Sequence, residues 1–146
     1  MHDSAAGQIV GSNATLYRPW WILEICQFRY NMPLMSKNDK LLILLNAEIK
    51  SPPFSKAARL EAGFLIRPLQ HGRLLGLPHS RPMPILGARC HELRITDLDK
   101  IWRIFYRADS DAIVVIEVIA KKTPTTPKPT IDLCIARLKR YDDETK

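Results

Sequence analysis

Apolar and polar residues alternate along several short stretches of the chain after residue 40. Between residues 41 and 49, Leu45, Ala47 and Ile49 alternate with polar positions, which is the period of a half-buried strand. Prolines end this first pattern. Further strand patterns follow at 89–95, 101–107 and 112–120, with turns at 96–99 and 109–111. Because these turns are short, we predict that the last three strands form an antiparallel meander.

A first helix is predicted between the opening strand and the meander. Ser55 can cap it, and it runs to about His71 and Gly72, where Gly72 is the terminator. Pro68 should kink or shorten it. Its apolar face consists of Leu60, Phe64 and Leu65, and a more polar stripe consists of Lys56, Arg59, Gly63, Arg67 and Gln70.

A second helix is predicted at the end of the chain. Thr126 and Pro127 suit the cap and the first helical position. The face expected to be buried has the spacing i, i+3, i+4, i+7 and consists of Ile131, Cys134, Ile135 and Leu138. Residues 76–87, between the first helix and the meander, contain three prolines and are predicted to be a loop.

Together these elements predict an α+β domain in residues 40–146, a small sheet flanked by helices in the order β-α-β-β-β-α. Residues 1–39 form an N-terminal extension, rich at first in Gly, Ser, Ala and Asn and then in aromatic residues. Two interpretations of it remain open. It is either an upstream, poorly ordered extension before a natural start at Met35, or an accessory hairpin or helix that packs Trp20 and Trp21 on the domain.

Positive charge is concentrated in the predicted domain. The chain of 146 residues has a formal net charge of +7, and residues 50–141 alone hold 17 Lys and Arg against 8 Asp and Glu. Such a surplus favours a nucleic acid, an acidic protein or an anionic membrane as partner. A merely solubilising surface is the alternative that charge by itself leaves open.

Cysteine spacing and hydropathy narrow the choice of compartment and chemistry. The three cysteines have no CxxC spacing, so we expect neither a disulfide framework nor a zinc site, and a reducing, cytoplasmic location. No apolar run approaches the roughly 20 residues of a membrane span. The chain also lacks HExxH, Walker and GxSxG motifs and a two-metal carboxylate cluster. We therefore expect no metal and no cofactor.

Four segments of the predicted domain place cations near one another. Arg94 and Arg103 lie on neighbouring strands, Lys121 and Lys122 end the last strand, and Lys128 opens the last helix. Antiparallel pairing brings such positions within reach of each other. Cations on rigid strands can hold a phosphate and stabilise the charge of a phosphoryl transition state. A metal-free ribonuclease fits this pattern, although from spacing alone an ordinary solvated face is the more frequent explanation.

Four short motifs carry a family resemblance. They are KSPPFS at 50–55, CHELR at 90–94, WRIFYR at 102–107 and AKKTP at 120–124. In this order and spacing they resemble a phage-derived HigB-like toxin of the RelE/ParE superfamily, over about residues 41–141. The resemblance implies a RelE-like antiparallel sheet flanked by helices. It also implies the toxin of a type II toxin–antitoxin pair, an endoribonuclease that cuts mRNA in the ribosomal A site without a cofactor and is neutralised by a helix-turn-helix antitoxin.

The resemblance also implies roles for individual residues. Arg94 would contact or polarise the phosphate, and Arg103 would stabilise transition-state charge. Lys122, with Lys121 beside it, falls where members place a basic residue at the end of the last strand. Lys128 falls where some members place a general acid. The further RNA-binding candidates are Arg107 and, on the proline-rich loop, His79 and Arg81, which have plain loop positions as their alternative.

Several positions depart from the family pattern. Glu92 stands where some members carry a second basic residue, so it would serve either as a base or as an ion-pair partner of Arg94 or Arg103. His91 should point to the same face as Leu93, as a buried, hydrogen-bonded histidine. Tyr106 is predicted to be a core aromatic with a tethered hydroxyl rather than an acid.

Functions without RNA cleavage remain as alternatives. A ParE-like relative would poison DNA gyrase, an accessory module would only bind RNA or an antitoxin, and an inactive relative would do neither. The predicted partners are thus mRNA with the ribosome and a helix-turn-helix antitoxin, with no membrane and no small-molecule cofactor.

Overall fold

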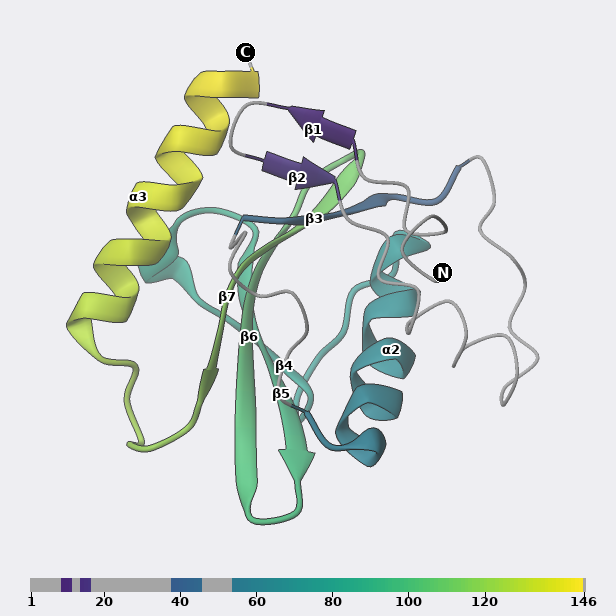
Figure 1. Ribbon diagram of the computed structural model, residues 1–146, viewed down its shortest axis with the longest axis vertical. Coiled ribbons are helices and arrows are strands. Elements are labelled where there is room, and N and C mark those ends of the chain that lie inside the picture. The colour runs from purple at the N-terminus through teal and green to yellow at the C-terminus, as the bar shows by residue number, and fades with distance from the viewer. Residues whose placement is uncertain (1–8, 12–13, 17–37, 46–53, 146) are drawn as a thin grey trace.

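A computed structural model describes residues 9–11, 14–16, 38–45 and 54–145. In it a sheet has the strand order β1-β2-β3-β7-β6-β5-β4, with α2 on one face and α3 on the other (Figure 1). The strands are β1 Ile9–Gly11, β2 Ala14–Leu16, β3 Leu41–Leu44, β4 Ser80–Pro82, β5 Cys90–Asp97, β6 Lys100–Ala108 and β7 Ala112–Ala120. The helices are α2 Lys56–Gln70, the short 3-10 helix η2 Pro84–Leu86 and α3 Lys128–Thr145.

The meander of β5, β6 and β7 is antiparallel throughout, as predicted. The expected order β-α-β-β-β-α and the α+β class are confirmed. The sheet itself is mixed, because β3 pairs parallel with β7. This follows from the connection through α2, which returns the chain to the far side of the sheet before the meander begins.

Helix α2 covers one face of the sheet. Its start is as predicted, because the Ser55 hydroxyl accepts the N–H of Ala58 at 3.1 Å. The helix ends at Gln70, two residues after Pro68. Its inward face packs on alternate residues of the strands, and the buried set comprises Ala58, Ala62, Leu65, Ile66, Leu69, Leu93, Ile95, Trp102, Ile104 and Ile113.

The predicted faces of α2 need correction. Phe64, expected to be apolar core, is 49% exposed. Arg67 and Gln70, assigned to the polar stripe, are buried together with Gly63. The physical reason is local pairing. The Arg67 guanidinium donates to Asp39 at 2.9 Å and the Gln70 amide donates to the carbonyl of Lys40 at 3.2 Å, so the segment before β3 replaces solvent at the end of the helix.

Helix α3 lies on the other face and meets it along a narrow stripe. Cys134 and Leu138 are buried, whereas Ile131 is half-buried and Ile135, predicted to be core, is 42% exposed. Cys134 and Leu138, with Ile131 packed beside them, face the sheet, so Ile135 stays on the flank of the helix. The helix begins at Lys128, one residue later than predicted, and the carbonyl of Pro127 accepts the N–H groups of Thr130 and Ile131.

The segment 76–87 is more ordered than its prolines suggested. It contains β4, which pairs with β5, and η2. Pro82 is tolerated because β4 is an edge strand, where a missing N–H costs little. β5 runs on to Asp97, which shortens the predicted turn at 96–99. The predicted first strand to Ile49 is seen as β3 to Leu44, and residues 46–53 lie outside the described part.

The N-terminal segment contributes a hairpin at the edge of the sheet. β1 pairs antiparallel with β2, and β2 pairs with β3. The aromatic cluster at 17–30 and the proposed start at Met35 lie outside the described residues.

Candidate nucleic-acid interface

The face of the sheet that carries α3 also carries the cations singled out in the sequence. Strand alternation points Glu92 and Arg94 of β5 to this face, away from Leu93 and Ile95, which pack under α2. Arg94 and Arg103 occupy directly opposite positions in the β5–β6 register. The prediction that strand pairing places these two arginines side by side is therefore confirmed.

A buried carboxylate organises this cluster. The side chain of Glu92 is 0% exposed. Its Oε1 lies 3.0 Å from Nε of Arg103 and 3.3 Å from Nε of Arg94, and its Oε2 lies 2.8 Å from Nη2 of Arg81. Arg81 reaches it because β4 places this residue opposite Glu92. Of the two roles open to Glu92, the geometry shows ion pairing, with three guanidinium groups around one carboxylate.

Arg103 connects the sheet to the loop that follows β7. Its guanidinium donates from Nη1 to Oγ1 of Thr126 at 3.2 Å, and from Nη2 to the carbonyls of Thr123 and Pro124 at 3.1 and 2.9 Å. The Nε–H does not point along a hydrogen bond, so its contact with Glu92 is an ion pair. Arg103 is only 1% exposed. We call its three hydrogen bonds to the loop at 123–126 the clasp.

The clasp shapes a cationic cavity of about 360 Å³ beside the arginines. The main-chain N–H of Lys121 donates to the carbonyl of Ile101 at 2.7 Å, which holds the start of the loop against β6. Lys122 follows and is exposed. Among the residues that the structure describes, no acidic side chain lines the cavity. The lining residues are Arg103, Ile119, Ala120, Lys121, Lys122, Thr123, Pro127 and Thr130.

Three other candidates lie outside this cavity lining. Lys128 is 85% exposed on its side chain and pairs with Asp132 one helical turn later. His79 is exposed, and its main-chain carbonyl accepts the N–H of Arg94 at 2.9 Å. Arg81 pairs with Glu92, which also contacts the cavity-lining Arg103. The structure thus gathers Arg103, Lys121 and Lys122 at the cavity. Arg94 lies opposite Arg103 outside the lining, and Arg81 meets the same carboxylate as these two arginines.

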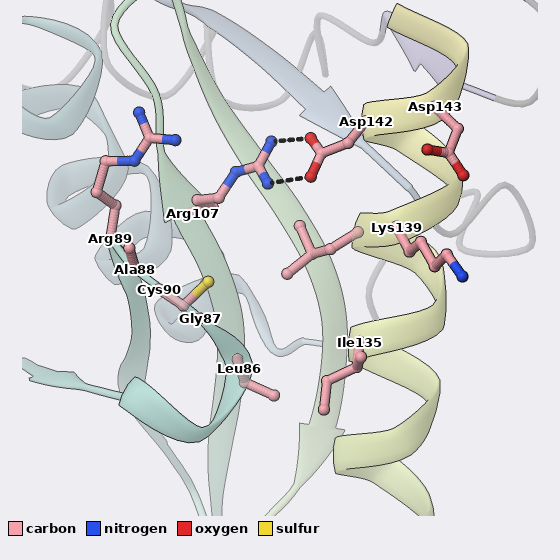
Figure 2. A pocket seen from close by; sticks show the side chains of 11 residues that line it. Leu86, Gly87, Ala88, Arg89, Cys90, Arg107, Ile135, Lys139, Asp142 and Asp143 are labelled. Carbon is pink, nitrogen blue, oxygen red and sulfur yellow. Dashed lines mark hydrogen bonds and ion pairs between the residues drawn. The ribbon is translucent and has the colours of Figure 1, made fainter.

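Arg107 belongs to a second hollow, of about 440 Å³, between α3 and the segment 86–90 (Figure 2). Its guanidinium is bidentate to Asp142 at 2.7 and 3.0 Å and also pairs with Asp109. The hydrogen bonds that Arg107 donates to Asp142 are the main reason why the pKa of Arg107 is raised. Asp109 and Asp142 already neutralise Arg107. We therefore assign Arg107 a structural role, in which it attaches α3 to β6.

His91 and Tyr106 lie on the face of the sheet that packs under α2. The two rings are stacked with centroids 5.4 Å apart, and Nδ1 of His91 is 3.0 Å from the carbonyl of Arg89. The hydroxyl of Tyr106 lies 2.7 Å from Oγ of Ser80, and burial raises the pKa of this phenol. The prediction of a core tyrosine with a tethered hydroxyl is confirmed. His91 is hydrogen-bonded as expected but only half-buried.

Sequence reasoning missed two parts of the site. Thr123 and Thr126 bind Arg103, and Thr126 had been assigned to capping α3. Arg81 was predicted as an RNA-binding candidate on a loop, but its pairing with Glu92 was not, because the prolines around it hid the strand that sets it opposite Glu92. Within the described ranges, no group of three His, Cys, Asp or Glu side chains could hold a metal ion. No described helix is long and apolar enough to cross a membrane.

Fold and site together define a class, namely a small α+β domain with a basic cluster under the loop that follows the last strand of its meander. Residues 52–139 match the model of the family described as phage derived protein Gp49-like (DUF891). The chain belongs to this family, which is a family of HigB-like toxins in the RelE/ParE superfamily. No protein of curated function and no solved structure matches the chain significantly.

Proposed function

We propose that this protein is the toxin of a type II toxin–antitoxin pair and cuts mRNA on the ribosome. The observation that carries the proposal is the cavity lined by Lys121, Lys122 and Arg103, with no acidic side chain among its described lining residues, next to the partly exposed Arg94. Such a site suits a phosphodiester, because its cations meet an anion with no competing carboxylate in the lining. Family membership supports the same class of activity.

In the proposed reaction, the 2′-oxygen of a nucleotide attacks the adjacent phosphorus. The bond to the 5′-oxygen of the next nucleotide breaks, the 2′ proton is released and the leaving oxygen gains a proton. The products are a 2′,3′-cyclic phosphate and a 5′-hydroxyl. Lys121 and Lys122 hold the phosphate and, together with Arg94, stabilise the charge that grows on its oxygens. Arg103 acts mainly by fixing the loop that presents the lysines.

The experiment is cleavage of a reporter mRNA by the purified full chain in the presence of 70S ribosomes, read by primer extension. We expect cuts at A-site codons that leave a cyclic phosphate, which a polynucleotide kinase with 3′-phosphatase activity would remove. Folded protein that leaves the message intact over a wide concentration range would refute the nuclease assignment.

The deep burial of Arg103 favours one second candidate. An arginine that is 1% exposed cannot touch a substrate without rearrangement, so a domain of this shape could act as a non-catalytic binder, for example as a ParE-like gyrase poison. A supercoiling assay with DNA gyrase separates the two, since only the binder would block the gyrase while leaving ribosome-bound mRNA uncut.

A further inference from the structure

We infer that Arg81, beside Arg94, forms a second phosphate site next to the cavity, and that Glu92 is the positioning residue that holds both guanidinium groups toward the same strand of RNA. This inference rests on the proposed function, because it extends the path of the RNA from the scissile phosphate to its neighbour. It assigns single-stranded RNA, bound through consecutive phosphates, as the ligand.

The first support is that each of the two arginines keeps N–H donors that are not used in its pairing with Glu92. Arg94 uses its Nε and Arg81 uses its Nη2. Within the described part of the chain, no other side-chain partner is seen for either. Their side chains are 33% and 42% exposed, whereas that of Arg103 is 1% exposed. Two anchored guanidinium groups therefore present N–H donors to solvent.

The second support is the charge balance. Three arginines surround one carboxylate, so the cluster keeps a surplus of two positive charges. Glu92 and Arg103 are both enclosed, with side chains that are 0% and 1% exposed. The surplus is left at the surface on Arg81 and Arg94, where it can bind an anion.

The third support is rigidity. Arg81 and Arg94 project from two paired strands, and both are held from beneath by the same carboxylate. A long side chain that is already fixed loses little conformational freedom on binding. A planar guanidinium fork also matches two phosphate oxygens at once, which an ammonium group cannot do.

The position of the pair points to RNA. Arg94 stands directly opposite Arg103, which lines the lysine cavity. Arg81 lies one strand further out. The cations thus form a track from the loop after β7, over β5, to β4. A polymer with regularly spaced phosphates can follow such a track, and each phosphate it engages adds to the dependence of binding on salt.

The test uses binding rather than cleavage. The probe is a fluorescein-labelled RNA of eight nucleotides in which every 2′-hydroxyl is methylated, so that it cannot be cut. Its affinity for the full chain is measured by anisotropy at several salt concentrations. We expect Arg81→Ala to weaken binding about tenfold and to reduce the slope of log K against log salt by about 0.7. The matched control is Arg73→Ala, an exposed arginine after α2, which should change neither.

A second arm locates the contact. Probes with one neutral methylphosphonate at successive positions should lose affinity for wild type at two neighbouring positions. With Arg81→Ala, the loss at one of these positions should disappear while the other stays. If the profile of Arg81→Ala equals that of wild type, or if wild type does not bind the probe at low salt, the second site is refuted, and an acidic protein segment becomes the better ligand for this pair.

Glu92 is tested as a positioning residue by Glu92→Gln. The glutamine amide would present an N–H to Nη2 of Arg81, donor against donor, and would release that side chain. We expect the positional profile to flatten at the Arg81 phosphate while the salt slope stays at least as steep, because no cation is lost. An unchanged profile in the folded variant would overturn the role.

Should Glu92→Gln not fold, Arg81→Lys decides the point. Lysine keeps the positive charge but lacks the planar guanidinium fork. The slope of log K against log salt should therefore persist, while the loss of affinity caused by a methylphosphonate at the Arg81 phosphate should become at least fivefold smaller. Full retention of discrimination would count against the inference. Failure of the proposed function would look different, namely an intact Arg81-dependent binding profile without any cleavage on ribosomes.

Discussion

Oε1 of Glu92 lies 3.0 Å from Nε of Arg103, at a place where neither side chain is more than 1% exposed. This pair joins three parts of the domain. Glu92 of β5 also pairs with the partly exposed Arg81 of β4 and Arg94, and Arg103 of β6 also bonds the loop after β7. Because Arg103 also bonds the loop after β7 and lines the cavity, the pair connects the interior of the sheet with the basic face.

Arg103→Met should lower the free energy of unfolding by about 3–5 kcal/mol, because it leaves Glu92 with one buried partner fewer. It also removes the hydrogen bonds that hold the loop at 123–126. Urea denaturation measures the change. Arg73→Met, at an exposed position, should stay within about 0.5 kcal/mol of wild type. A loss below 1 kcal/mol for Arg103→Met would show that the clasp is dispensable.

Lys122→Ala should reduce ribosome-dependent cleavage about 100-fold, the order of effect seen when one group that stabilises transition-state charge is removed. Lys122 is exposed, so the free energy of unfolding should not change. The matched control is Lys56→Ala, an exposed lysine on α2, on the opposite face of the sheet. Equal loss in both variants would point to a general charge effect instead of a site.

Tyr106→Phe should leave cleavage unchanged, because the hydroxyl is bonded to Ser80 in the core and does not face the cationic cavity. Stability should fall by about 1 kcal/mol, the usual net value of one hydrogen bond. Cleavage rates and thermal unfolding of the same preparation provide both numbers. A large loss of activity with normal stability would make the phenol an acid after all.

Asp97→Asn should destabilise the protein at neutral pH, and the difference from wild type should shrink in acid. The pKa of Asp97 is lowered, first by the hydrogen bond from the Ser55 hydroxyl and then by the Ser55 N–H at 3.1 Å. A carboxyl with a lowered pKa stabilises the fold fully above its ordinary value near 4 and loses this effect as the pH falls.

The measurement for Asp97 is the free energy of unfolding of both proteins between pH 7 and pH 2. The gap should be constant above about pH 5 and shrink below about pH 4. Asp99→Asn, in the same turn and exposed, should differ from wild type by less than about 0.5 kcal/mol at pH 7. A gap for Asp97→Asn that grew in acid would contradict the assignment.

Asp142→Asn should loosen the C-terminal half of α3. Asp142 binds Arg107 at two points (Figure 2), but its side chain is 46% exposed, so solvent screening limits the cost to roughly 0.5–1 kcal/mol. Amide hydrogen exchange should become faster in the last turns of α3 and not in β6. Its neighbour Asp143, exposed on the same helix, gives the matched variant Asp143→Asn, which should exchange as wild type does.

The sequence alone determined the elements whose signals are local. The cap at Ser55, the strands β5, β6 and β7 and the facing of Arg94 and Tyr106 follow from hydrogen-bonding chemistry and from the period of two along a strand. These signals are contained in a few neighbouring residues. The concentration of positive charge and the family motifs were equally readable without a fold.

Tertiary structure alone decided what each charged group meets. Arg67 is buried because Asp39 lies beside it, and Ile135 is exposed because α3 touches the sheet along one narrow stripe. Arg81, Glu92 and Arg103 converge from three strands, and the Thr126 hydroxyl accepts a hydrogen bond from Arg103. Such pairings join residues far apart in the chain, and no periodicity encodes them. The physical reason is that burial and electrostatics depend on distance in space, which is set only when the strands have paired.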